Sequence, residues 1–354
     1  MSECRHRKKR RLIVAPNIHT GGGLVLLKSL LKCSGSLDDS ILILDSRAQK
    51  ELSFYVGTRD VFWTPCGILG RIKAELFARK RENECTNIFC FHNLPTFFTK
   101  KKVSVFLQNR LLVEQSSLSD FSLRPWVRIA LERLILKTLF KKIAQFLVQT
   151  ESMKSTIDNW VNSEGLNQKC SIKITPFVPE IDENDHADSN LPDSTDSDFI
   201  YVADGQPHKN HINLLKAWEI LASQGHFPKL LLTLPERDYE LKSQIKQLSE
   251  KKGLSIYDIG MVSNKDIIGL YNESKALIFP STLESFGLPL VEANQCGLPI
   301  IASELDYVRD VCEPCQTFDP NSPISIARAV TRFLGYNHLR NRPMSAEQFI
   351  QEYL

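Results

Sequence analysis

The sequence lacks the features that mark a membrane-spanning or a disulfide-stapled protein. No apolar stretch reaches the roughly 18 residues that a membrane-spanning helix needs. The basic N-terminus is not followed by the apolar run and small-residue cleavage site of a signal peptide. The nine cysteines are odd in number and lie scattered along the chain, which favours reduced thiols. These absences predict a cytoplasmic protein.

Signatures of metal, ATP and dinucleotide sites are missing as well. The single Cys-x-x-Cys, formed by Cys312 and Cys315, has no second cysteine pair at zinc spacing. No segment matches the G-x-x-x-x-G-K-[ST] phosphate loop, and the glycines near the N-terminus do not complete G-x-G-x-x-G. We therefore expect no metal and no bound cofactor.

The composition is that of a globular chain with an uneven distribution of charge. The 354 residues, 42% of them hydrophobic, suggest two domains. Residues 1–179 carry 29 Lys and Arg against 15 Asp and Glu, whereas residues 180–354 carry 15 against 26. A basic half favours an anionic partner, such as a phosphorylated substrate, a membrane surface or nucleic acid. A chance spread of solvated charges is the alternative.

Short apolar runs alternate with helix-length segments, which predicts parallel strands joined by crossover helices. The predicted strands are 11–16, 41–45, 87–92, 103–108, 145–149, 199–203, 229–234, 255–259, 276–279 and 299–302. The predicted helices include 24–33, 124–142, 212–224, 239–252, 265–274 and 288–296. Residues 180–198 are acidic at eight of nineteen positions and predict an exposed linker. We expect α/β domains over 1–179 and 199–338, followed by a C-terminal helix over 339–354 that could pack back on the first domain.

Residues 276–302 carry the most chemical information. A predicted strand ends at Phe279, and a helix is expected to start near Leu288, so the amides of Ser285 to Leu288 would be free to bind a phosphate. Glu284 precedes that helix, and Glu292 lies about one turn inside it, where a carboxylate can accept hydrogen bonds from sugar hydroxyls. An ordinary strand, turn and helix with two surface glutamates explains the same residues.

The eight-residue spacing of Glu284 and Glu292, with Phe-Gly and Pro between them, resembles the retaining glycosyltransferases of family four, the group 1 glycosyltransferases. The run into this motif agrees, because Ile259-Gly-Met-Val is followed by residues 266–271 and Ala276-Leu-Ile-Phe-Pro-Ser. The resemblance covers residues 197–318 well and the first half in outline. It implies the GT-B fold, in which two Rossmann-like domains with parallel sheets face a central cleft.

The resemblance also implies roles in the second domain. Glu292 would hold the donor ribose, and Glu284 would act on the transferred sugar as a catalytic residue. The amides of Phe286 and Gly287, flanked by Ser285 and Leu288, would meet the sugar and the diphosphate.

Lys209 would bind and stabilise the diphosphate. The family usually has an arginine five positions before that lysine, where this chain has Asp204. His208 or Arg237 would then have to supply the missing positive charge.

Three features of the first domain complete the expected site. Gly21, Gly22 and Gly23 follow the first strand, and such glycines let a backbone approach a phosphate or sugar closely. By resemblance, they would reach the donor from the opposite domain, and His92 would reach the transferred sugar as a third catalytic residue. Asn109 and Arg110 follow the next strand and are weaker candidates for acceptor contacts. A tight turn and a satisfied strand-end histidine are the alternatives.

Two basic segments fit peripheral association with the inner face of the cytoplasmic membrane. Arg5–Arg11 contains six Lys or Arg residues, which an anionic surface attracts. Residues 124–142 combine apolar side chains with Arg133, Lys137 and Lys141, spaced by four. A mostly buried crossover helix with one wet stripe is the alternative interpretation.

The sequence therefore predicts a retaining, hexosyl-transferring glycosyltransferase in polysaccharide or glycolipid assembly. Its partners would be a nucleotide-sugar donor and a saccharide or lipid-linked acceptor, with no nucleic acid. A GT-B sugar-nucleotide epimerase or phosphorylase is the alternative among enzymes. A non-catalytic scaffold of a glycan-assembly complex is the alternative of another class.

Overall fold

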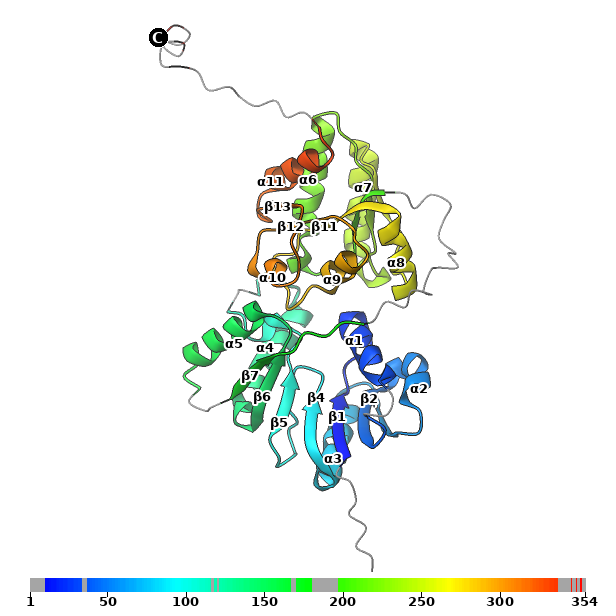
Figure 1. Ribbon diagram of the computed structural model, residues 1–354, viewed down its shortest axis with the longest axis vertical. Helices are drawn as coiled ribbons and strands as arrows, with labels where there is room; N and C mark the ends of the chain where they lie inside the picture. The colour runs from blue at the N-terminus through cyan, green and yellow to red at the C-terminus, as the bar shows by residue number, and fades with distance from the viewer. Residues whose placement is uncertain are drawn as a thin grey trace, which may run out of the picture.

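The computed structural model describes residues 10–33, 37–115, 118–119, 121–166, 170–179 and 197–336, together with residues 345, 348 and 351. Two α/β domains are stacked along the long axis of the molecule, with the first domain at the bottom of Figure 1. The predicted linker falls almost wholly, and the predicted C-terminal helix largely, outside the described residues. No helix among the described residues is both long and apolar enough to cross a bilayer.

The first domain contains a seven-stranded parallel sheet with the order β3-β2-β1-β4-β5-β6-β7. Its strands are β1 (Arg10–Ala15), β2 (Ser40–Asp45), β3 (Asp60–Thr64), β4 (Cys85–Cys90), β5 (Val103–Phe106), β6 (Ile143–Val148) and β7 (Ser171–Ile174). Its helices are α1 (Gly21–Lys32), α2 (Gln49–Val56), α3 (Ile68–Arg81), α4 (Leu123–Thr138) and α5 (Glu151–Ser163).

Helices cover both faces of this sheet, as the near-continuous apolar strands require. In β2, Ile41 and Ile43 pack on the face covered by α3, α4 and α5. Leu42 and Leu44 point to the opposite face, which α1 and α2 cover. The two faces of the sheet thus belong to two separate cores.

The second domain contains a six-stranded parallel sheet with the order β10-β9-β8-β11-β12-β13. Its strands are β8 (Ser197–Tyr201), β9 (Leu230–Leu232), β10 (Ile256–Asp258), β11 (Ser274–Phe279), β12 (Ile300–Ser303) and β13 (Gln316–Phe318). Its helices are α6 (His211–Ser223), α7 (Tyr239–Lys252), α8 (Asn264–Asn272), α9 (Leu288–Gln295), α10 (Asp306–Arg309) and α11 (Pro323–Phe333). Each sheet has the reversed strand order of a Rossmann-like fold, and such sheets bind ligands at the carboxyl ends of their strands.

Candidate active site

An ion pair between Lys209 and Glu284 lies at the centre of the candidate site. Lys209 ends a short 3-10 helix, Pro207–Lys209, after β8, whereas Glu284 lies in the loop between β11 and α9. The Lys209 Nζ lies 2.6 Å from Glu284 Oε1, and the two side chains are 18% and 12% exposed. The structure thus brings together, from neighbouring strands, two residues that are 75 positions apart in the sequence.

Hydrogen bonds fix the two loops against each other. The buried Tyr201 hydroxyl donates to the Lys209 carbonyl oxygen at 2.7 Å and lies 3.0 Å from Ser281 Oγ. Burial raises the pKa of Tyr201 well above its usual value, so the hydroxyl keeps its proton. The Thr282 amide donates to the His208 carbonyl oxygen at 2.8 Å. The ammonium and the carboxylate are therefore held on a rigid double loop.

Glu292 lies one turn into α9, as the sequence predicts. Its side chain is half-buried, and Oε2 accepts a hydrogen bond from the Tyr271 hydroxyl at 3.2 Å. Burial raises the pKa of Glu292, although the hydrogen bond from Tyr271 works in the opposite direction. Gly287, at φ +77°, lies in the left-handed region immediately before the helix. A side chain there would be strained, and this explains the glycine.

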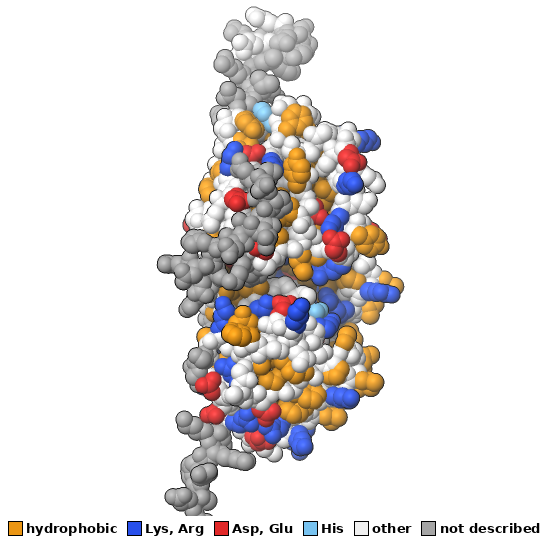
Figure 2. All heavy atoms as spheres, turned by 90° about the vertical axis from the view of Figure 1, so that its right-hand side faces the viewer, with side chains coloured by type: hydrophobic (Ala, Val, Ile, Leu, Met, Phe, Trp, Pro, Cys, Tyr) orange, Lys and Arg blue, Asp and Glu red, His pale blue; other side chains and the backbone are white. Residues whose placement is uncertain are grey.

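Residues 283–288 form one part of the contact between the two domains. Ser285 Oγ donates to the Gln108 carbonyl oxygen at 2.6 Å, and Thr150 Oγ1 donates to the Ser285 carbonyl oxygen at 3.1 Å. Leu288 packs on the first domain, where a Cβ added to Gly22 would lie 2.8 Å from Leu288 Cδ1. Figure 2 shows the hollow between the domains, with charged and histidine side chains along its lower rim.

The glycine segment lies at this interface. Gly21 adopts a positive φ of +66° and begins α1, and the space beside Gly22 is occupied by Leu288. A Cβ on Gly23 would lie 3.4 Å from Gln108 Oε1. Gly22 thus allows the first domain to approach the second closely, whereas the neighbours of Gly23 belong to the first domain. The contact of the three glycines with a donor stays a prediction.

His92 follows β4 and is buried, with partners on both ring nitrogens. Nδ1 donates to the Val14 carbonyl oxygen at 2.9 Å, and Nε2 accepts from Arg71 Nη1 at 2.7 Å. Burial and the positive charge of Arg71 hold the pKa of His92 well below its usual value, so the ring is neutral. In this arrangement both ring nitrogens of His92 have partners within the first domain, and its contact with a transferred sugar stays a prediction.

Asp204 forms an ion pair with Arg237. Arg237 Nη2 lies 3.0 Å from Asp204 Oδ2, and Gln206 Nε2 donates to the same oxygen at 2.9 Å. Burial opposes ionisation of Asp204, but Lys209 and these partners outweigh it and lower its pKa. The pKa of His208 is also lowered, chiefly by burial, so that ring is neutral. His208 and Arg237 are the two residues expected to supply the charge of the arginine that Asp204 replaces, and of these Arg237 is the charged one.

Asn109 and Arg110 lie beside the interface and are engaged within the protein. Asn109 Oδ1 accepts from the Leu111 amide at 3.1 Å, and Arg110 Nε donates to Glu114 Oε2 at 2.8 Å. Arg110 also lines a polar cavity of about 350 Å³ between the two domains, whose other walls are the start of α5 and the helix α10. The Ser152 amide in α5 donates to Asp310 Oδ2 beside it, at 2.8 Å.

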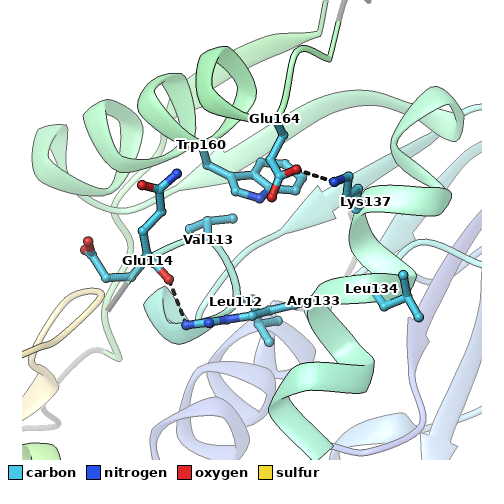
Figure 3. A pocket seen from close by; sticks show the side chains of 9 residues that line it. Leu112, Val113, Glu114, Arg133, Leu134, Lys137, Trp160 and Glu164 are labelled. Carbon is cyan, nitrogen blue, oxygen red and sulfur yellow. Dashed lines mark hydrogen bonds and ion pairs between the residues drawn. The ribbon is translucent and has the colours of Figure 1, made fainter. Parts of the chain in front are cut away.

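The basic stripe expected on residues 124–142 differs from the prediction. The helix α4 ends at Thr138, so Lys141 lies beyond it in a 3-10 turn (Phe140–Lys142). Arg133 points to the Glu114 carbonyl oxygen, and Lys137 forms an ion pair with Glu164 (Figure 3). These contacts surround a cavity of about 150 Å³ whose lining includes Trp160. The interpretation as a mostly buried helix is also wrong, since Leu123, Leu131 and Leu134 are exposed.

The sequence analysis did not identify Tyr201, Tyr271, Thr150 or Asp310. Thr150 carried a local signal, because a Thr after a strand and before Glu151 is typical of a helix N-cap, and its Oγ1 accepts from the Met153 amide. Tyr271 and Asp310 act through partners at least 21 residues away, and Tyr201 contacts both Lys209, eight positions on, and the distant Ser281, so no helix or strand pattern points to these three side chains.

Three comparisons with known proteins agree with this geometry. Residues 182–348 match the family model described as glycosyl transferases group 1. The serotype-specific mannosyltransferase WbdA of Escherichia coli is 31% identical over 150 residues, which are 42% of this chain but 18% of that protein. The O-antigen chain mannosyltransferase RfbU of Salmonella typhimurium is 22% identical over 62% of this chain and 60% of its own length.

Among solved structures, Anabaena HepE in complex with UDP and glucose superposes with a TM-score of 0.67. The two chains are 17% identical, and the match covers 92% of this chain and 90% of that one. This likeness confirms the GT-B fold.

Proposed function

We propose that the chain is a group 1 glycosyltransferase, which transfers a hexose from a nucleotide diphosphate sugar to an acceptor hydroxyl in polysaccharide or glycolipid assembly. The observation that carries this proposal is the Lys209–Glu284 pair beside residues 285–287, at the contact between the domains. A positive charge at this point stabilises the diphosphate as it leaves, which is electrostatic catalysis.

Each carboxylate has a separate part in the proposal. Glu292 accepts hydrogen bonds from the ribose hydroxyls, and Tyr271 fixes its orientation. Glu284 contacts the transferred sugar and also positions the ammonium group of Lys209. The amides of Phe286 and Gly287 and the glycines of the first domain approach the sugar and diphosphate from both sides.

The relatives suggest which donors to test first. Two of them are named mannosyltransferases, so GDP-mannose is the first candidate, and UDP-glucose is the second. The purified chain should release free GDP or UDP from one of these donors when a hydroxyl acceptor is added. Turnover of the sugar nucleotide without an acceptor would favour an epimerase, and a requirement for inorganic phosphate would favour a phosphorylase.

We further propose retention at the anomeric carbon and transfer without a divalent metal ion, with Lys209 and the backbone amides supplying the positive charge. NMR of the product immediately after transfer would show the configuration, and an inverted product would contradict the proposal. Activity should persist in excess EDTA. A loss of activity in EDTA that Mg²⁺ or Mn²⁺ restores would contradict transfer without a metal ion, but not retention.

The acceptor is proposed to be a saccharide or a lipid-linked saccharide, bound mainly by the first domain. The enzyme would then work at the inner face of the cytoplasmic membrane as a peripheral protein. The support is the positive charge of the first 179 residues and the assembly of O-antigen named for the relative RfbU. An absence of nucleotide binding would instead favour the non-catalytic scaffold.

A further inference from the structure

The outward faces of α3 and α4 are apolar where surface helices are usually polar. Leu69 is 76% exposed on α3, and Leu123 is 75% exposed on α4. Seven more apolar side chains on the two helices are exposed, namely Ile68, Ile72, Leu76, Trp126, Val127, Leu131 and Leu134. Clustered exposed apolar side chains of this kind mark contact with a protein partner or a membrane.

These side chains are not displaced members of the core. In α3, Ala74 and Ala78 are buried against the sheet, whereas Ile72 and Leu76, one turn apart, lie on the opposite side of the helix. In α4, Ile129 and Leu136 face the sheet. Each helix therefore has one apolar side for the core and a second one for solvent.

The two helices belong to one continuous face. Both pack on the same side of the first sheet, in the core cluster that contains Ala74 and Ile129. The segment 97–99 joins α3 to the turn that follows α4, because Glu75 of α3 accepts from the Phe97 amide at 2.8 Å and Lys142 of that turn donates to the Thr99 carbonyl oxygen at 3.0 Å. Phe98, 46% exposed, adds a further apolar side chain to this face.

The charges on this face are almost entirely positive. Besides Lys137, which forms an ion pair with Glu164, the two helices expose four cations, namely Lys73, Lys80, Arg124 and Arg128. The single acid of α3, Glu75, is buried in an ion pair with Arg71, and the single acid of α4, Glu132, is partly buried. Lysine is depleted at the core of protein–protein interfaces, whereas apolar side chains flanked by cations suit an anionic bilayer.

We propose that the face formed by α3, α4 and residues 97–99 docks on the surface of a bilayer that contains anionic lipids. The apolar side chains would enter the boundary between headgroups and acyl chains, and the four cations would lie among the headgroups. This surface differs from the Arg133, Lys137 and Lys141 stripe, whose first two members are engaged within the first domain.

The docking face reaches the edge of the cleft. Arg71, near the start of α3, contacts His92 at the end of β4, and Phe121, just before α4, stacks on His208 of the second domain with ring centroids 6.2 Å apart. A bilayer on this face would therefore lie beside the opening of the cleft and present a lipid-linked acceptor to it. This consequence rests on the proposed transferase function, whereas docking itself does not.

The test is sedimentation of the full chain with phosphatidylcholine vesicles, with and without phosphatidylglycerol. We expect binding to the anionic vesicles, and the double variant Leu69→Gln/Leu123→Gln should weaken it about tenfold or more. The variant Lys73→Glu/Arg124→Glu should lose the preference for anionic vesicles. Phe54→Gln is the matched control, because Phe54 is 89% exposed on α2, on the opposite face of the sheet, and it should bind like the wild type.

Residues 5–11 are unchanged in all these variants, so a loss of binding can be assigned to the docking face. Unchanged vesicle binding by Leu69→Gln/Leu123→Gln would overturn the proposal. A wild-type chain that ignores vesicles but forms a dimer that this variant disrupts would also overturn it, in favour of a protein interface. Thermal shift with the donor nucleotide, measured on the same variants, separates a failure of docking from a failure of the donor site.

Discussion

Lys209 has an internal partner in the absence of donor, and its role depends on exchanging that partner for a diphosphate. Its ammonium group lies 2.6 Å from Glu284 Oε1, close enough to a leaving phosphate group at residues 285–287 to share its charge. We expect Lys209→Met to lower kcat/KM by about 10²- to 10³-fold, the range found when one stabilising donor is removed from an active site. Lys216→Met, at an exposed position on α6, is the control and should leave kcat/KM unchanged.

Glu292 links the donor site to the pH dependence of stability. Its pKa is raised by burial from an ordinary value of 4.5, so the folded state binds this proton more tightly than the unfolded state does. The contribution of Glu292 to the free energy of unfolding therefore falls as pH rises from 4.5 through the raised pKa of the folded state. Glu292→Gln should raise the Tm of the nucleotide-free protein at pH 8 by about 1–3 °C, and the gain should disappear near pH 4. A gain that is the same at both pH values would contradict this account.

At the scale of elements, α1 contacts α9 where Gly22 lies against the Leu288 side chain. A Cβ on Gly22 would lie 2.8 Å from the end of the Leu288 side chain, so a larger residue must displace that side chain, the start of α9 or the domain. We expect Gly22→Val to lower kcat/KM about tenfold with little change in Tm, since the clash lies between the domains rather than inside a core. Gly22→Val/Leu288→Ala should recover part of the loss, and equal loss in both variants would show that the clash is not the cause.

The sequence predicts the central strands because they are buried on both sides. Residues 41–44 form an unbroken apolar run, and β2 covers Ser40–Asp45. The three strands absent from the prediction, β3, β7 and β13, all lie at sheet edges, where half-buried side chains such as those of Ser171–Ile174 form no such run. An unbroken apolar run in the sequence indicates a strand that is buried on both faces. An edge strand lacks such a run, and its formation depends on pairing with its single neighbour.

The site shows the same division between local and distant information. The position of Glu292 on a helix follows from its spacing from Glu284, because the residues between them include the turn and the start of α9. The pairing of Arg237 with Asp204 joins two loops 33 residues apart, and the partners of His92 come from β1 and α3. Those contacts depend on how strands are ordered in the sheet, and no local pattern fixes that order.

At the scale of the whole molecule, the two domains meet through a few polar contacts, the apolar side chains of Leu283 and Leu288, and the stacking of Phe121 on His208. The Ser152 amide and Asp310 Oδ2 join α5 to the segment after α10 on one side of the cleft. We expect Asp310→Ala to open the cleft in the nucleotide-free protein, seen as a larger radius of gyration in small-angle X-ray scattering, with the donor restoring the closed form. An unchanged scattering curve would mean that the Ser285 and Leu288 contacts are sufficient to hold the domains together.

The most direct test of the donor site is isothermal titration of the wild-type chain with GDP, UDP, ADP, GDP-mannose and UDP-glucose, repeated with Lys209→Met and Glu292→Ala. The account predicts that one nucleotide and its sugar conjugate bind selectively, that Lys209→Met weakens both diphosphates, and that Glu292→Ala abolishes or greatly weakens binding. Lys216→Met should bind like the wild type. No binding by any of these ligands, or equal binding by all the variants, would contradict a donor site built on Lys209, Glu284 and Glu292.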